Sequence, residues 1–120
     1  HAAAAAFNCI NELDQNVEIY EQNRAVLLKG LPKIGLDQFA SVDGAFYIYA
    51  NVSHLTNDSE KFCRQMLKEI GVATTPGTDF DLERGRSYIR FSFSGPPKDI
   101  KEAVQRIENW LPNPAKTQFF

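Results

Sequence analysis

The chain has 120 residues, of which 43% are hydrophobic and 23% are charged, and its formal net charge is −2. These values fit one globular domain around one hydrophobic core. They give no electrostatic basis for binding nucleic acid or an anionic membrane, and no apolar run is long enough to span a bilayer. Cys9 and Cys63 are distant in sequence, which favours two free, buried thiols in a reducing compartment such as the cytoplasm.

A long helix is predicted over about residues 2–30. Its alanine run, Ala2 to Ala6, favours helix and lacks the charged and bulky apolar regions of a signal peptide. A helix of this length spans roughly 30 Å, about the width of a whole domain of this size. Its apolar stripe, interrupted by Arg24, consists of Ile10, Leu13, Val17, Tyr20, Leu27 and Leu31.

Three explanations of this long stripe remain open: an ordinary packed helix, a short coiled-coil seam, or a helix that packs partly on protein outside this chain. We favour the third. The chain also begins with His1 rather than methionine, which suggests a piece of a longer or processed protein.

The middle of the chain predicts an extended segment, a strand and a second helix. Gly30-Leu31-Pro32 ends the first helix, and residues 38–41 are predicted to be extended. After a turn signal at Asp43-Gly44, residues 45–52 predict an aromatic-rich strand. A capping box at Asn57 to Glu60 begins a helix that ends at Gly71. The apolar face of that helix carries Phe62, Cys63, Met66, Leu67 and Ile70.

The last third predicts two strands and a final helix. Residues 72–75 predict a short strand, Pro76-Gly77 a turn, and residues 79–86 a polar loop before a strand over residues 87–94. The last helix, from Pro97 to Pro112, carries Ile100, Ala103, Val104, Ile107, Trp110 and Leu111 on its apolar face. This order predicts a single α+β domain, residues 1–120, with a small antiparallel or mixed sheet packed against helices.

Arg90 is the candidate ligand-binding residue. On the predicted strand, Ile89, Phe91 and Phe93 alternate onto one face, and Tyr88, Arg90, Ser92 and Ser94 onto the other. A guanidinium can bind a carboxylate through two parallel hydrogen bonds. By periodicity alone an exposed or salt-bridged arginine is the commoner explanation, and a carboxylate ligand is the functional alternative.

Other patterns of catalysis or ligand binding are weak. His54 lies in a polar turn without a second histidine or a cysteine at metal-ligand spacing, which favours a surface or capping role. Asp79 and Asp81 are more typical of a solvated loop than of an acid–base pair. No nucleophile elbow or phosphate loop surrounds the serines and glycines Ser41, Ser53, Ser59, Gly71, Gly77 and Gly85.

Several segments resemble class I/II aminotransferases, the aspartate-aminotransferase-like enzymes of fold type I that depend on pyridoxal phosphate. Residues 44–53 are similar to the family's Gly-Ala-Phe-Tyr strand. Residues 62–80 are similar to its helix and the Gly-Val-Ala-Val-x-Pro-Gly-x-x-Phe strand and turn, and residues 88–93 to its arginine-bearing strand. The resemblance covers nearly the whole chain. It implies the C-terminal small domain, with residues 1–31 leading out of a large domain.

The resemblance implies that Arg90 binds the α-carboxylate of both the amino acid and the 2-oxo acid. It places the pyridoxal phosphate and the Schiff-base lysine in the large domain, so we expect no catalytic, cofactor-binding or metal-binding residue here, and no activity of the isolated chain. It implies a homodimeric parent enzyme without nucleic acid or membrane partners. Phe46 is expected to be a core aromatic rather than part of the pocket mouth. None of the lysines matches the family's motif: Lys29, Lys33, Lys61, Lys68, Lys98, Lys101 and Lys116.

A non-enzymatic α+β module that binds a small molecule or a protein through the Arg90 face is the alternative. It predicts a closed apolar core, whereas a domain severed from an aminotransferase predicts a partly bare long helix and Arg90 face. Neither explanation identifies the amino acid substrate, because side-chain selection in the family depends on the large domain and the neighbouring subunit.

Overall fold

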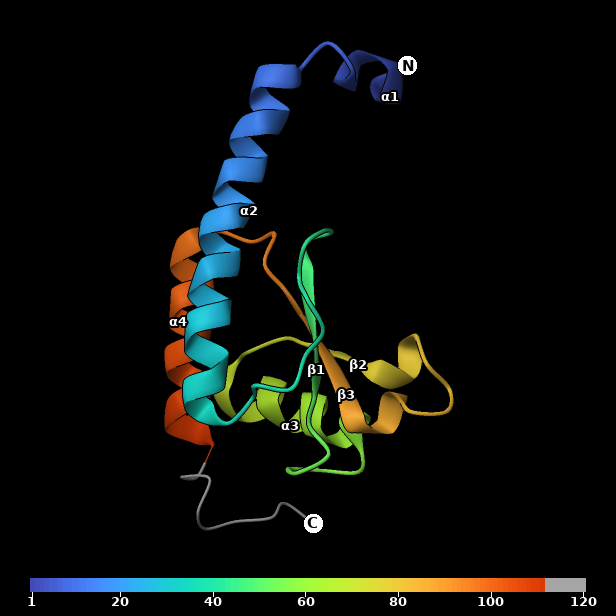
Figure 1. The fold of residues 1–120 in the computed structure, drawn as a ribbon, viewed down its shortest axis with the longest axis vertical. Helices are drawn as coiled ribbons and strands as arrows, with labels where there is room; N and C mark the ends of the chain where they lie inside the picture. Colours follow the sequence, from blue (N-terminus) through green and yellow to red (C-terminus); the bar gives the residue numbers. More distant parts are fainter. Residues whose placement is uncertain (112–120) are drawn as a thin grey trace.

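The structure is a computed structural model, and it describes residues 1–111 (Figure 1). The predicted helix end at Pro112 and the side chain of Lys116 lie outside these residues. The elements, with η for a 3-10 helix, are α1 (Ala2–Ala6), α2 (Ile10–Gly30), η1 (Leu31–Ile34), β1 (Tyr47–Asn51), α3 (Ser59–Ile70), β2 (Thr75–Pro76), η2 (Gly77–Asp79), η3 (Gly85–Ser87), β3 (Tyr88–Ser92) and α4 (Pro97–Trp110).

The three strands form one antiparallel sheet in the order β1-β3-β2, so β3 is central. Side chains alternate across each strand. On β3, Ile89 and Phe91 are buried on one face, whereas Tyr88 and Arg90 are half-buried on the other. The predicted α+β class is confirmed, and within residues 1–111 the sheet is antiparallel throughout.

The helices pack against the apolar face of this sheet. α2 and α4 lie side by side, and α3 contacts β2 and β3 (Figure 1). The last helix buries the face that its periodicity predicts, with Ile100, Ile107 and Leu111 in the core. The buried side chains of the sheet and the helices form one cluster: Leu27, Leu31, Ile34, Leu36, Val42, Ile48, Ala50, Val52, Phe62, Cys63, Met66, Val72, Ile89, Phe91, Phe93, Ile100, Ile107 and Leu111.

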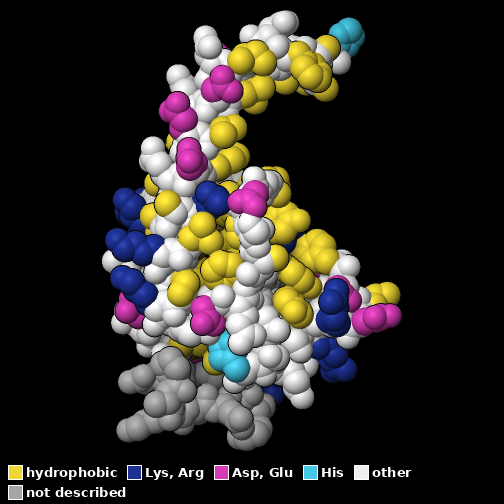
Figure 2. Space-filling model, viewed as in Figure 1, with side chains coloured by type: hydrophobic (Ala, Val, Ile, Leu, Met, Phe, Trp, Pro, Cys, Tyr) yellow, Lys and Arg dark blue, Asp and Glu magenta, His cyan; other side chains and the backbone are white. Residues whose placement is uncertain are grey.

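The N-terminal half of α2 extends beyond the sheet and carries α1 at its end (Figure 1). Residues 1–19, called the arm below, are all exposed, and the molecule measures 51 × 29 × 27 Å. Figure 2 shows hydrophobic side chains along the concave side of the arm and acidic side chains on its outer side. The exposed apolar residues of the arm include Phe7, Ile10, Leu13 and Val17. Only the C-terminal half of the predicted stripe therefore finds a partner among the described residues.

The predicted continuous helix over residues 2–30 is wrong at Phe7–Cys9, where α1 ends and α2 has not begun. Cys9 has φ −107° and ψ 43°, which is not a helical conformation. Asn8 is a poor helix former, and five alanines that bury nothing add too little stability to continue the helix through it. In the part of the chain that is described, no helix combines the length and the apolar character needed to cross a membrane.

Several finer predictions are also corrected. Asp58, not Asn57, caps α3, because its carboxylate accepts the backbone N–H of Lys61 at 3.0 Å. The strand predicted at 72–75 is only Thr75–Pro76, the two residues that pair with β3. Leu67 is exposed at the margin of the buried face of α3.

Phe46 is 46% exposed rather than a core aromatic. It precedes β1, directly after a turn in which Ala45 has φ 57°, so the alternation of β1 does not determine where its side chain lies. Cys9 is exposed on the arm rather than buried, whereas Cys63 is buried as predicted.

Candidate carboxylate-binding site

Arg90 lies in the middle of the central strand. Its register partners are Tyr49 on β1 and Thr75 on β2, so a strand flanks it on either side. The alternation of β3 turns its side chain away from the buried Ile89 and Phe91. Arg90 therefore lies opposite the apolar face, as the sequence predicts.

The guanidinium of Arg90 has few hydrogen-bond partners. Nη2 donates to Thr75 Oγ1 at 3.4 Å, which is a long hydrogen bond. Nε is buried and has no acceptor among the described residues. Within residues 1–111, no carboxylate forms a salt bridge with Arg90, although carboxylates do pair with Arg24, Arg64, Arg84 and Arg106. A buried donor without an acceptor costs about 1–3 kcal/mol, so this guanidinium is suited to an acceptor from elsewhere.

Two aromatic rings lie against the guanidinium. The guanidinium carbon of Arg90 is 5.4 Å from the ring centroid of Tyr47 and 4.8 Å from that of Phe80, distances typical of cation–π contacts. Tyr47 begins β1 and Phe80 follows η2, so the rings come from opposite sides of the central strand. Tyr49 and Tyr88 stack nearby with centroids 4.9 Å apart. The site is thus an aromatic surface around the guanidinium of Arg90.

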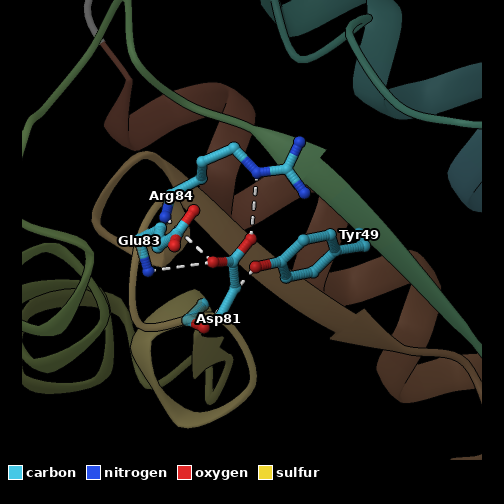
Figure 3. A network of polar contacts seen from close by, with 5 residues as sticks. Tyr49, Asp81, Glu83 and Arg84 are labelled. Atoms are coloured by element: carbon cyan, nitrogen blue, oxygen red, sulfur yellow. Dashed lines mark hydrogen bonds and ion pairs between the residues drawn. The ribbon is translucent and has the colours of Figure 1, made fainter.

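The segment that carries Phe80 is a loop, residues 77–87, stabilised by the carboxylate of Asp81 (Figure 3). One oxygen of Asp81 accepts the backbone N–H groups of Arg84 at 2.9 Å and Glu83 at 3.0 Å, and the other accepts Arg84 Nε at 3.2 Å. These hydrogen bonds, first that from the Arg84 backbone, lower the pKa of Asp81. Asp81 therefore acts as an ionised cap of the loop.

Tyr49 connects the sheet to this loop. Its hydroxyl lies 3.5 Å from the carbonyl oxygen of Gly77 (Figure 3). Burial, and then the negative charge of Asp81, raise the pKa of Tyr49. The phenol therefore stays protonated at neutral pH and can donate to the loop.

The remaining candidates from the sequence do not join this site. His54 and Asp79 are exposed, in agreement with a surface role. Ser59 is buried and donates to the carbonyl oxygen of Gly85 at 2.9 Å, which is a structural contact. Burial raises the pKa of the Cys63 thiol, although Thr74 donates a hydrogen bond to its sulfur. Among the described residues, no group of three or more His, Cys, Asp or Glu could hold a metal ion.

Three neighbours of Arg90 were not identified from the sequence: Tyr47, Thr75 and Phe80. Each belongs to a different segment, and their proximity follows from the strand register and the path of the 77–87 loop. The one available signal was the phenylalanine of the Gly-x-x-Phe turn, which occurs here as Gly77 to Phe80.

The sequence of this chain matches a known protein family. The family model "Aminotransferase class I and II" matches residues 1–107. The chain therefore belongs to the class I and II aminotransferases, and the resemblance noted in the sequence is confirmed.

The relatives with known names are much longer than this chain. The valine–pyruvate aminotransferase of Mycobacterium tuberculosis (strain ATCC 25618 / H37Rv) is 51% identical over 93% of this chain and 29% of its own length. An aspartate aminotransferase of Sulfolobus acidocaldarius is 31% identical over 92% of this chain and 28% of its own length. The crystal structure of a putative aminotransferase from Silicibacter pomeroyi superposes with a TM-score of 0.88 and 47% identity, covering 92% of this chain and 30% of that one.

Proposed function

We propose that this chain is the C-terminal small domain of a longer aminotransferase, and that Arg90 binds the α-carboxylate of the amino acid and of the 2-oxo acid. The observation that carries the proposal is the buried Arg90 Nε, which has no acceptor within residues 1–111. Guanidinium suits this role better than an ammonium group, because its planar donors match a carboxylate in two parallel hydrogen bonds. Both substrates carry that carboxylate, so one arginine can serve both halves of the reaction.

Two observations support a longer parent protein. The chain spans 29% of the length of the relative to which it is 51% identical. The concave side of the arm also exposes apolar side chains that a second domain would bury (Figure 2). In this proposal, residues 1–31 lead from the large domain into residues 32–120, and the parent assembles as a homodimer.

Residues 1–111 do not by themselves fit pyridoxal phosphate, the cofactor on which the family generally depends. Their lysines are all exposed on helices rather than gathered near Arg90: Lys29, Lys33, Lys61, Lys68, Lys98 and Lys101. We therefore assign the cofactor and the amino-group chemistry to the rest of the parent protein. The role of this domain is to bind and orient the substrate, and correct positioning of a substrate contributes to catalysis.

The proposal is tested with Arg90→Ala and Arg90→Lys in the full-length protein, assayed first with L-valine and pyruvate because of the name of the 51% identical relative. Losing a charge-assisted hydrogen-bonded contact costs about 1.5–3 kcal/mol, or roughly a 10- to 150-fold fall in kcat/KM. We expect Arg90→Lys to fall between wild type and Arg90→Ala, because lysine retains the charge but not the two-pronged geometry. The visible absorption of the bound cofactor should not change.

Arg64→Ala is the matched control, because Arg64 is an exposed arginine of α3 that pairs with Glu60 four residues away. Its kcat/KM should equal that of the wild type. Wild-type kinetics in Arg90→Ala would contradict the assigned role. Transamination by the 120-residue chain alone would contradict the assignment of the chemistry to the rest of the protein.

A further inference from the structure

We propose that Phe80 is a positioning residue for Arg90: its ring holds the guanidinium in place for a substrate carboxylate while using none of its N–H donors. The inference rests on the proposed function of Arg90. Phe80 is 56% exposed, so core packing does not explain its position. Its ring centroid nevertheless lies 4.8 Å from the guanidinium carbon of Arg90.

The chemistry of the ring explains why an apolar residue stands beside this cation. An aromatic face attracts a cation through its quadrupole and accepts no conventional hydrogen bond. A carboxylate in the same place would occupy donors that the substrate needs, as Asp81 accepts the Nε–H of Arg84. Phe80 can therefore restrict the long, flexible side chain of Arg90 without competing with a ligand. Tyr47 comes from the other side of β3, so the guanidinium of Arg90 contacts one aromatic ring from each side of the strand.

The backbone around Phe80 is built to hold it there. The N–H groups of Phe80 and Asp81 both donate to the carbonyl oxygen of Gly77 at 2.9 Å. The carboxylate of Asp81 then caps the next turn of the loop. Two residues after Phe80, Leu82 is 93% exposed, so the loop directs one apolar side chain towards Arg90 and leaves the other in solvent.

A restrained guanidinium loses less conformational entropy when it binds a carboxylate, which raises affinity without a new contact to the ligand. The ring also keeps water from one side of the ion pair and so strengthens the attraction. The expected effect of Phe80 is on substrate affinity, because the ring acts on the substrate through the guanidinium of Arg90.

The test compares Phe80→Leu with Phe80→Tyr and Phe80→Trp in the full-length holoenzyme, using L-valine and pyruvate. Leucine keeps apolar volume without a π face, whereas tyrosine and tryptophan keep the ring. A cation–π contact of this kind corresponds to a factor of about 3 to 30. We expect KM for both substrates to rise by that factor in Phe80→Leu, with kcat nearly unchanged, and to return towards wild type in Phe80→Tyr and Phe80→Trp. Leu82→Ala, on the same loop, should change neither constant.

A double-mutant cycle with Arg90→Gln separates this inference from the function on which it rests. If Phe80 acts through Arg90, Phe80→Leu should lower kcat/KM in the wild type but not in the Arg90→Gln background. Equal losses in both backgrounds, or wild-type kinetics in Phe80→Leu, would overturn the role of Phe80 and leave that of Arg90 standing. Wild-type kinetics in Arg90→Gln would instead overturn the proposed function. Thermal unfolding of each variant shows whether a rise in KM reflects unfolding. Phe80→Tyr keeps the inference testable if Phe80→Leu unfolds.

Discussion

Replacing Gly85 by alanine should destabilise the domain through a backbone clash beneath the 77–87 loop. A Cβ added at Gly85 would lie 2.3 Å from both the carbonyl carbon and the carbonyl oxygen of Gly77, and 2.5 Å from the backbone nitrogen of Thr78. Backbone atoms cannot rotate away as a side chain can, so the two turns of the loop must separate. Gly85 does not have positive φ, so the penalty is steric rather than conformational.

The magnitude follows from two contributions. Overpacking of a rigid site costs typically 1–3 kcal/mol, and the immobile neighbours argue for about 3 kcal/mol here. Displacing Gly85 would also weaken the buried hydrogen bond from Ser59, which contributes on the order of 1 kcal/mol. A loss of about 3–4 kcal/mol is a large part of the stability of a small domain and corresponds to a fall in Tm of roughly 12–30 °C.

The assay is urea and thermal unfolding of the 120-residue chain, followed by far-UV circular dichroism and by the fluorescence of Trp110. Trp110 is the single tryptophan of the sequence. The centroid of its ring lies 5.4 Å from that of Phe62, so its fluorescence reports on the packing of the helices. Gly44→Ala is the matched control, because a Cβ there meets nothing within 4 Å. Equal midpoints for Gly85→Ala and Gly44→Ala would refute the reasoning.

Three further predictions concern other groups. Asn23 is buried, and its side-chain amide donates to the carbonyl oxygens of Phe93 at 2.9 Å and Gly95 at 2.8 Å. Asn23→Ala should lower the free energy of unfolding by about 2–3 kcal/mol, because both acceptors lose their donor. Equal urea midpoints for Asn23→Ala and for the variant Gln22→Ala, at the exposed neighbouring residue, would contradict this prediction. The lowered pKa of Asp81 means that its hydrogen bonds stabilise the loop fully above the ordinary aspartate pKa of ~4, and that this stabilisation is lost as pH falls through the lower pKa of the folded state. The backbone amide signal of Arg84 in an NMR titration should follow that transition, and Asp81→Asn, which keeps an acceptor but cannot ionise, should abolish it. Burial raises the pKa of the Cys63 thiol, whereas Cys9 is exposed. A thiol reagent should therefore modify Cys63 at least about 100-fold more slowly than Cys9 until the chain is unfolded. Equal rates of modification in the folded chain would contradict this prediction and show that the core admits the reagent.

The strand that carries Arg90 could be predicted because its pattern depends on a local rule. Successive side chains of a strand point to opposite faces, so the apolar alternation at Ile89, Phe91 and Phe93 required that Arg90 lie on the other face. All three apolar residues are buried in the structure. The turn glycines, the start of α4 at Pro97 and the α+β class followed from similarly local signals, whereas the choice between an antiparallel and a mixed sheet did not.

The surroundings of Arg90 could not be predicted in the same way. Tyr47 and Thr75 approach it through strand register, and no local pattern in the sequence specifies which residues pair. Phe80 lies in a segment that composition identifies only as a polar loop. Its position depends on the contact of Gly77 with Gly85 and on the cap at Asp81, which are interactions between residues that have no periodic pattern.

The stripe on α2 shows a different limit of sequence analysis. Helical periodicity identifies a face that needs a partner, but it does not say which protein segment supplies that partner. Leu27 and Leu31 meet the core of this chain, whereas Ile10, Leu13 and Val17 remain exposed on the arm. The division falls near Tyr20, which is partly buried, although the stripe itself does not change character there. The stripe of α2 therefore has one half that packs into the core of this domain and one half that stays exposed among the described residues, and only the three-dimensional structure separates the two.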